Sequence, residues 1–167
     1  MEAPVSLFEL CDSSGNKHRT RHGDVLPFKI VCDALIGRDW DCIAAITALH
    51  TRPFRRVEPI ERGGSPYAQA LTRYVNPAAE RILIVDDVLT TGESFERMRA
   101  RVLSVEFQYP DFNWQVQSPD HWPPVVKLID GFVLFNRSRG LYNEFSWVKS
   151  LFTLLGDTDG KDNERAT

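Results

Sequence analysis

The stretch that most constrains the fold of this chain lies in its middle. Residues 82–85 are Ile-Leu-Ile-Val, and two adjacent aspartates, Asp86 and Asp87, follow them directly. An unbroken, largely β-branched run is typical of a strand buried on both faces of a parallel sheet, because such strands do not alternate apolar with polar residues. The sequence therefore predicts an α/β fold with a parallel sheet.

The segments around this run follow one order of strand, loop and helix. Residues 56–60 are predicted to form a strand that leads into a loop over 61–65, and Ser65 followed by Pro66 is a typical helix start. Residues 90–94 turn into a further helix. The predicted buried faces of the two helices are Tyr67, Leu71, Tyr74 and Val75, and Phe95, Met98, Val102 and Val105. Right-handed crossovers then give a parallel Rossmann-like sheet flanked by helices.

Apolar spacing predicts the remaining elements. One helix is expected over residues 26–35, capped by Asp24 and ended by Gly37, and a second over residues 40–49. Strands are expected over 125–129 and 132–135, on either side of Gly131. A last helix is predicted from the spacing of Leu141, Phe145, Val148, Phe152 and Leu155, with Gly156 as its end.

Residues 107–124 follow none of these patterns. They contain four prolines and no regular apolar spacing, and the segment is long for a plain connection. We expect it to act as a lid or as an insertion that packs a subunit interface.

Length and composition narrow the class of protein. A chain of 167 residues has the length of about one domain, predicted here over residues 1–156 with a polar tail over 157–167. Its 43% apolar and 26% charged residues exclude wholesale disorder. No apolar run reaches the roughly 18 residues of a membrane span, and the first residues do not resemble a signal peptide. A cytoplasmic protein without membrane partners is expected.

The formal net charge of −3 argues against nucleic acid as a partner. Basic runs at residues 17–22 and 52–56 leave a nucleic-acid regulator as a third alternative, although such runs are more often solvated surface. Cys11, His18, His22 and Cys32 could be drawn as a zinc set, but the chain has no Cys-x-x-Cys pair. Buried apolar positions for Cys32 and Cys42 are the simpler interpretation.

The chemistry is concentrated after the central strand. Asp86 and Asp87 stand at the carboxyl end of a predicted parallel strand, where open α/β sheets bind ligands. Thr90, Thr91 and Gly92 then lead into a helix N-terminus, whose unpaired N–H groups and dipole favour a phosphate. Carboxylates beside a phosphate site suit a ribose 5-phosphate. The alternative without a ligand is an acidic turn followed by a threonine-rich helix cap.

Residues 81–94 as a whole resemble the phosphoribosyl-pyrophosphate signature of the type I phosphoribosyltransferases. The resemblance implies the fold of that family, with a small irregular hood over the sheet. It implies that Asp86 and Asp87 face the ribose hydroxyls and hold Mg²⁺ through the substrate or water. The residues that would wrap the 5-phosphate are Leu89, Thr90, Thr91, Gly92, Glu93 and Ser94.

Residues 57–71 are similar to the pyrophosphate loop of the orotate-type branch of this family. By that resemblance, the pyrophosphate loop consists of Glu61, Arg62, Gly63, Gly64 and Ser65, with the two glycines exposing backbone N–H groups to the ligand. Residues 134–140 are similar to the stretch that carries an acid–arginine pair near the base. Asn136 stands in place of the acid, so Arg137 is a weaker candidate for the base site.

The resemblance implies the transfer of a phosphoribosyl group from phosphoribosyl pyrophosphate to a ring nitrogen of a nucleobase or related heterocycle. Asp87 would be the catalytic residue, a carboxylate that stabilises the cationic sugar or takes a proton from the base. Mg²⁺ would be the cofactor and a homodimer the assembly. One departure from the family is a missing flexible loop, because only residues 76–80 separate the predicted helix from the central strand. This departure favours the alternative of a non-catalytic regulator that binds phosphoribosyl pyrophosphate or a nucleotide.

Overall fold

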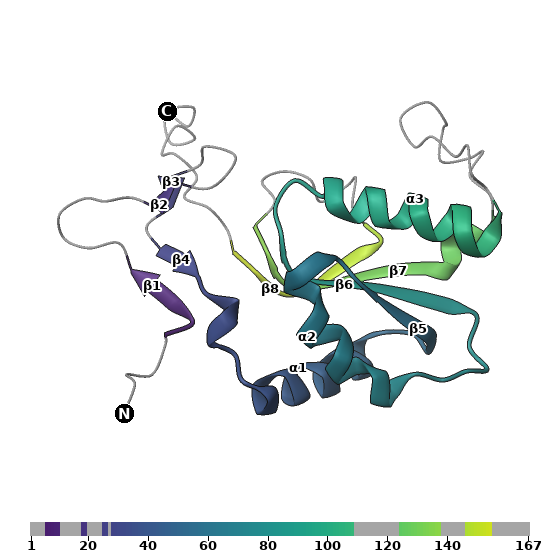
Figure 1. Ribbon diagram of the computed structural model, residues 1–167, viewed down its shortest axis with the longest axis horizontal. Helices are drawn as coiled ribbons and strands as arrows, with labels where there is room; N and C mark the ends of the chain where they lie inside the picture. The colour runs from purple at the N-terminus through teal and green to yellow at the C-terminus, as the bar shows by residue number, and fades with distance from the viewer. Residues whose placement is uncertain are drawn as a thin grey trace, which may run out of the picture.

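The computed structural model describes residues 6–10, 18–19, 25–26, 28–108, 124–137 and 146–154. Its centre is a four-stranded sheet in the order β5-β6-β7-β8, in which every pairing is parallel (Figure 1). The strands are β5 (Phe54–Pro59), β6 (Arg81–Leu89), β7 (Ile129–Asn136) and β8 (Val148–Thr153). The predicted α/β class and parallel sheet are therefore confirmed.

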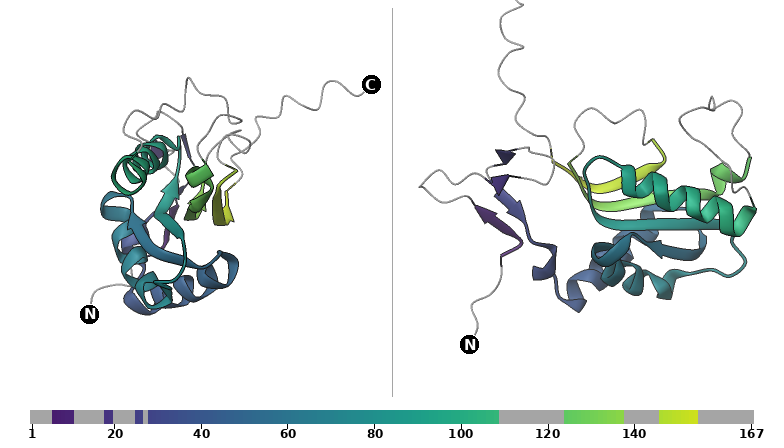
Figure 2. Two further views of the ribbon diagram at one scale, coloured as in Figure 1. Left: turned by 90° about the vertical axis from the view of Figure 1, so that its right-hand side faces the viewer. Right: turned by 45° about the horizontal axis from the view of Figure 1, so that its top comes forward.

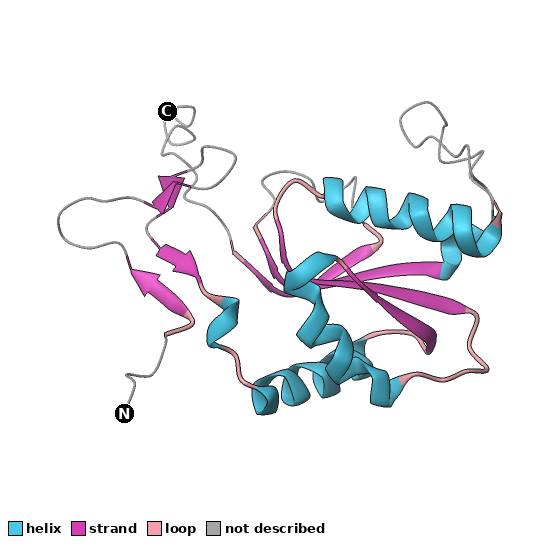
Figure 3. Ribbon diagram, viewed as in Figure 1, coloured by secondary structure: helices cyan, strands magenta, loops and turns pink. Residues whose placement is uncertain are grey.

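Helices cover both faces of this sheet. α1 (Gly37–His50) and α2 (Glu61–Leu71) lie on one face, and α3 (Glu93–Phe107) lies on the other (Figure 3). Each face has its own hydrophobic cluster, one around Tyr67 and Leu83 and one around Ile84 and Phe95. Three short 3-10 helices, η1 (Cys32–Ala34), η2 (Thr72–Tyr74) and η4 (Pro124–Leu128), connect these elements.

Two small antiparallel pairs lie beyond the carboxyl ends of the sheet strands, and we call them the hood (Figure 2). β1 (Phe8–Leu10) pairs with β4 (Phe28–Ile30), and β2 (His18–Arg19) pairs with β3 (Val25–Leu26). The ring of Phe8 packs edge-on against Phe28 and Phe135, at centroid distances of 5.7 and 5.8 Å. The hood is thus attached to the end of β7.

Several sequence predictions are confirmed. Residues 82–85 are at most 1% exposed, as expected for a strand covered on both faces. The helix predicted over 40–49 is α1, and Tyr67 and Leu71 are the fully buried residues of α2. On α3, Phe95 and Val102 are buried, whereas Val105 is 68% exposed and Leu103 is buried in its place.

The helix predicted over residues 26–35 is wrong. This stretch contains β3, β4 and η1, and Gly37 begins α1 rather than ending a helix. The N–H of Ile36 donates to the carboxylate of Asp39, which fixes the first turn of α1. An acid three residues inside a helix is a start signal, and here it outweighs the preference of glycine for helix ends.

The start predicted for α2 is also wrong. The helix begins at Glu61, so Pro66 is its sixth residue and the segment 61–65 is helical instead of a loop. The Ser65 hydroxyl donates back to the carbonyl of Glu61 and does not cap the helix. A proline after the first turn removes one helical hydrogen bond, and the contacts of α2 with β6 outweigh this loss.

At the end of the chain, two predictions need correction. Residues 124–128 form η4, and β7 runs without a break through Gly131. Residues 148–153 form β8 and not a helix. The apolar spacing resembles that of a helix, but Phe152 stacks on Phe135 of the neighbouring strand β7, with ring centroids 5.4 Å apart. Its partner is therefore on another strand and not one helical turn away.

Other predictions fall on residues outside the described ranges. These are most of the segment 107–124, the tail over 157–167, and Cys11 and His22 of the zinc set. Among the described residues no helix has the length and apolar character needed to cross a membrane.

Candidate functional site

The candidate site lies at the carboxyl edge of the sheet, where β6 ends. Asp86 and Asp87 both belong to β6, and successive side chains of a strand point to opposite faces. Asp87 points to the face of α1 and α2, where it lines a pocket with Gly63 and Cys32. The two carboxylates therefore lie on opposite faces of the sheet, near the carboxyl end of β6.

The carboxylate of Asp87 is closely surrounded. A Cβ atom built on Gly63 would lie 2.5 Å from Asp87 Oδ1, so α2 approaches β6 as closely as a residue without a side chain permits. On the other side, the thiol of Cys32 in η1 donates a hydrogen bond to Asp87. Burial, and then the charge of Asp87, raises the pKa of Cys32 well above its usual range, so this thiol stays protonated.

The surroundings of Asp86 favour the protonated form of its carboxyl group. Burial, and then the negative charge of Asp87, raises the pKa of Asp86 to about 8, and Glu61 adds to the effect. The N–H of Asp87 donates to Asp86 Oδ1 at 2.9 Å. Within the described residues, neither carboxylate forms a salt bridge. Two close carboxylates without a protein cation suit a bound divalent cation, whose preferred ligands are oxygens.

The turn between β6 and α3 has the backbone of an anion site. Gly92 adopts a left-handed conformation with φ 81° and ψ −9° immediately before α3. The first N–H groups of α3 have no acceptor within the helix, and the helix dipole is positive at this end. The positive φ of Gly92 explains why this position is a glycine, as a bulkier residue would be strained there.

The start of α2 differs from the pyrophosphate loop that the sequence suggests. The N–H of Gly64 is already bonded to the carbonyl of Ile60, at 3.1 Å. A Cβ on Gly64 would lie 2.5 Å from the Val85 carbonyl oxygen, so this glycine permits the close packing of α2 on β6. The backbone N–H groups open to a ligand are those of the first helical turn. Glu61, at that turn, has a positive φ of 40°.

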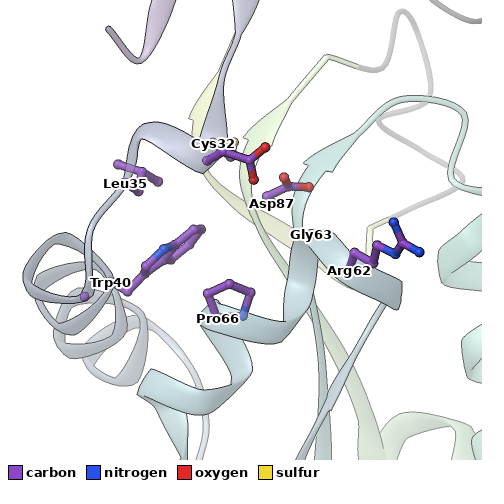
Figure 4. A pocket seen from close by; sticks show the side chains of 9 residues that line it. Cys32, Leu35, Trp40, Arg62, Gly63, Pro66 and Asp87 are labelled. Carbon is purple, nitrogen blue, oxygen red and sulfur yellow. The ribbon is translucent and has the colours of Figure 1, made fainter. Parts of the chain in front are cut away.

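A pocket of about 370 Å³ lies beside Asp87 and the start of α2, and Figure 4 shows it. Its lining comes from three segments: η1 with the start of α1, the first turns of α2, and the end of β6. The lining residues are Cys32, Asp33, Leu35, Gly37, Trp40, Arg62, Gly63, Pro66 and Asp87. Asp87, Arg62 and Gly63 are among the site residues that the sequence predicts. The sequence does not predict the lining residues 32–37, because it assigns residues 26–35 to a helix that ends at Gly37.

Solved structures show what this arrangement is similar to. UMP synthase from Leishmania donovani matches with a TM-score of 0.58 and 14% identity, over 89% of this chain and 34% of that one. Orotate phosphoribosyltransferase from Mycobacterium tuberculosis matches with a TM-score of 0.55 and 14% identity, over 83% and 86%. The Aeropyrum pernix orotate phosphoribosyltransferase gives 0.52 and 17%, over 81% and 86%. The chain has the fold of an orotate phosphoribosyltransferase.

The likeness is one of structure. The sequence matches no protein-family model, and no curated protein matches it. The chain corresponds to about a third of the Leishmania UMP synthase. At 14 to 17% identity, these neighbours show the phosphoribosyltransferase fold, with its Rossmann-like parallel sheet.

The connection that precedes β6 is short in the structure as well. The N–H of Asn76 donates to the Phe54 carbonyl, and its side-chain oxygen accepts from the N–H of Ala78. These bonds close residues 76–80 into a compact turn at the amino end of β6. Because the site lies at the carboxyl end of the same strand, this turn cannot cover it.

Two other sequence candidates lie apart from the pocket. Arg137 follows β7, and its N–H donates to the Leu89 carbonyl at 2.9 Å, so its backbone is held at the end of β6. Arg137 is not among the residues that line the pocket. The basic run 52–56 is paired with acids: Arg52 contacts Asp130, and Arg55 and Arg56 contact Glu106. This pairing weakens the case for a nucleic-acid surface there.

The cysteines differ from the simple prediction of buried apolar positions. Cys42 is exposed on α1, and Cys32 is partly buried with its thiol bonded to Asp87. No cluster of three potential metal ligands from His, Cys, Asp and Glu is found in the part of the chain that the structure describes.

Proposed function

We propose that this protein transfers a 5-phosphoribosyl group from phosphoribosyl pyrophosphate to a ring nitrogen of a nucleobase or related heterocycle, with release of pyrophosphate and with Mg²⁺ as cofactor. The observation that carries the proposal is the end of β6. There two carboxylates precede a left-handed glycine and a helix N-terminus, beside a pocket, on a phosphoribosyltransferase fold. A homodimer in the cytoplasm is part of the proposal, and sedimentation velocity tests the assembly.

The arrangement suits a ribose carrying phosphates at two positions. The turn 89–94 and the N-terminus of α3 would bind the 5-phosphate through backbone N–H groups and hydroxyls. Asp86 and Asp87 would bind the ribose hydroxyls. The first turn of α2, with Arg62 and Gly63, would face the pyrophosphate, since Arg62 lines the same pocket as Asp87.

The donor set fits a magnesium ion. Asp86 and Asp87 offer hard oxygen ligands, and the raised pKa of Asp86 indicates that a second negative charge is poorly compensated there. Bound magnesium would supply positive charge to the phosphate oxygens. Asp87 would stabilise the positive charge that develops on the ribose or accept a proton from the base. Positioning and electrostatics would account for most of the rate enhancement.

A second candidate function is regulation by ligand binding without catalysis. The compact turn over 76–80 favours it, because an oxocarbenium-like ribose must be shielded from water. Within the described residues, the hood lies beyond the carboxyl ends of the sheet strands (Figure 1).

The experiment has two readouts. Titration calorimetry with phosphoribosyl pyrophosphate, with and without magnesium, tests binding, and a pyrophosphate-release assay with a panel of nucleobases tests transfer. We expect tighter binding with magnesium, and we expect the double variant Asp86→Asn, Asp87→Asn to bind at least roughly tenfold more weakly, as expected for the loss of charged contacts. Glu80→Gln, an exposed charge change at the other end of β6, is the control.

The outcomes separate the candidates. Binding with pyrophosphate release supports the transferase. Binding without release for any base supports the regulator. If the wild-type protein does not bind phosphoribosyl pyrophosphate, both candidates are wrong.

A further inference from the structure

The pocket beside Asp87 has an apolar side and a polar side. Leu35, Trp40 and Pro66 form the apolar side, and Asp87 and Arg62 stand opposite (Figure 4). The Trp40 indole is 6% exposed and packs against the buried ring of Tyr67 at a centroid distance of 5.6 Å. Such a fixed aromatic wall suits a flat ring, because little conformational freedom is lost when a ligand binds to it.

The polar side has an excess of negative charge. Asp33 and Asp87 contribute two carboxylates to the lining, and Arg62 is the one cation among the described lining residues. Asp33 directly follows Cys32 in η1, and the Cys32 thiol is hydrogen-bonded to Asp87, so both carboxylates border the same small volume.

Arg62, the cation of the lining, lies apart from the apolar side of the pocket (Figure 4). It belongs to the first turn of α2, where the proposed function places the pyrophosphate, and its side chain extends past Asp87 to the side opposite Trp40 and Leu35 (Figure 4). A carboxylate on a ring lying against Trp40 would therefore meet Asp33 and Asp87 without a cation beside it. Like charges repel, so such a ring should bind more weakly than an uncharged ring of the same shape.

We propose that the acceptor is an uncharged or cationic nitrogen heterocycle, bound between the Trp40–Leu35 wall and the Asp33–Asp87 carboxylates, and that bases carrying a carboxylate are excluded. This inference rests on the proposed function and specifies its acceptor. It separates this chain from the orotate enzymes with which it shares a fold, since orotate is a carboxylated base. Asp33, on the surface of η1, is the specificity residue.

Two matched pairs of probes test the proposal, uracil with orotate and nicotinamide with nicotinate. Within each pair the rings match and the members differ in the carboxylate. Binding of all four is measured by calorimetry on the full chain, saturated with magnesium and ribose 5-phosphate. The same series is run on Asp33→Asn, which should fold normally because the side chain of Asp33 is exposed. The control is Glu80→Gln, an exposed charge change at the far end of β6.

We expect the wild-type protein to bind the uncharged member of each pair more tightly. In Asp33→Asn the preference should fall by roughly 3- to 10-fold, the effect of removing one nearby like charge. Glu80→Gln should keep the wild-type preference. Equal or tighter binding of a carboxylated member by the wild-type protein, or a preference that Asp33→Asn leaves unchanged, would overturn the proposal.

A separate titration with phosphoribosyl pyrophosphate keeps the two conclusions distinct. A protein that binds this donor with magnesium and prefers orotate contradicts the acceptor class and leaves the proposed function standing. A protein that does not bind the donor contradicts both.

Discussion

At the scale of single residues, two neighbours determine the position of the Asp87 carboxylate, Gly63 and Cys32. Gly63 has no side chain at the point where a Cβ would lie 2.5 Å from Asp87 Oδ1, and the Cys32 thiol holds the same carboxylate from the hood side. A Cβ on Gly64 would lie 2.5 Å from the backbone carbonyl oxygen of Val85. The two glycines are adjacent in sequence, yet they affect different properties of the protein.

We expect Gly63→Ala to displace the Asp87 carboxylate and to weaken binding of phosphoribosyl pyrophosphate by roughly tenfold or more, with a small change in stability, since a carboxylate can rotate away. Gly64→Ala should instead lower the free energy of unfolding by about 1–3 kcal/mol, because it presses on backbone. Calorimetry and urea denaturation measure the two effects. Gly37→Ala, with open space around it, is the control for stability. Equal effects of Gly63→Ala and Gly64→Ala on stability would contradict this.

The raised pKa of Cys32 predicts slow reaction with thiol reagents. The thiolate is the reactive form, and burial together with the charge of Asp87 disfavours it. At pH 7.5, we expect an iodoacetamide label to reach Cys32 at least roughly tenfold more slowly than the exposed Cys42, as mass spectrometry of peptides would show. Asp87→Asn removes one cause of the shift and should speed the labelling of Cys32 alone. Equal labelling rates for Cys32 and Cys42 in the wild-type protein would show that the prediction is wrong.

At the scale of elements, the β6–α3 turn determines whether a phosphate can approach the helix N-terminus. Gly92, at φ 81°, is buried between the end of β6 and α3. A residue with a Cβ pays about 1–2 kcal/mol in this conformation. We expect Gly92→Val to lower the free energy of unfolding by at least this amount and to abolish binding of nucleoside monophosphates. A folded variant with normal affinity would mean that the phosphate site is elsewhere.

The elements that the sequence predicts well are those whose signals are local. Residues 82–85 are apolar without interruption, and only a strand covered on both faces satisfies that pattern. Gly92 and the residues around it predict a turn before a helix because glycine tolerates a positive φ. The structure confirms the strand and the turn, which are the local features beside the candidate site.

The elements that it predicts poorly depend on distant partners. β8 has the spacing of a helix, but Val148 pairs with Gly131 and Phe152 with Phe135 of β7, which no local pattern records. The local pattern predicts a helix over 26–35, where the structure has β3, β4 and η1. The role of residues 32–40 as a pocket wall follows from the contact of Cys32 with Asp87, more than fifty residues away.

At the scale of the whole molecule, the site forms only when three separate segments meet. The segment 32–40 follows the hood, residues 61–66 begin α2, and Asp87 lies near the carboxyl end of β6. The hood is held by the packing of Phe8 on Phe135 and by the hydrogen bond from the N–H of Val31 to the Leu7 carbonyl. The carboxylates at this junction repel one another and so oppose the meeting of the three segments. The free energy of unfolding should therefore depend on pH.

The response has a definite sign. The pKa of Asp86 is about 8 in the folded protein and about 4 in an unfolded chain, so the folded state keeps a proton that the unfolded state releases. The contribution of Asp86 to stability is complete below pH 4 and is lost as the pH rises through 8. We expect the free energy of unfolding, from urea denaturation, to fall by on the order of 4 kcal/mol between pH 5 and 9. Asp86→Asn should flatten this slope and Glu80→Gln should keep it; equal slopes in the two variants would contradict the assignment to Asp86.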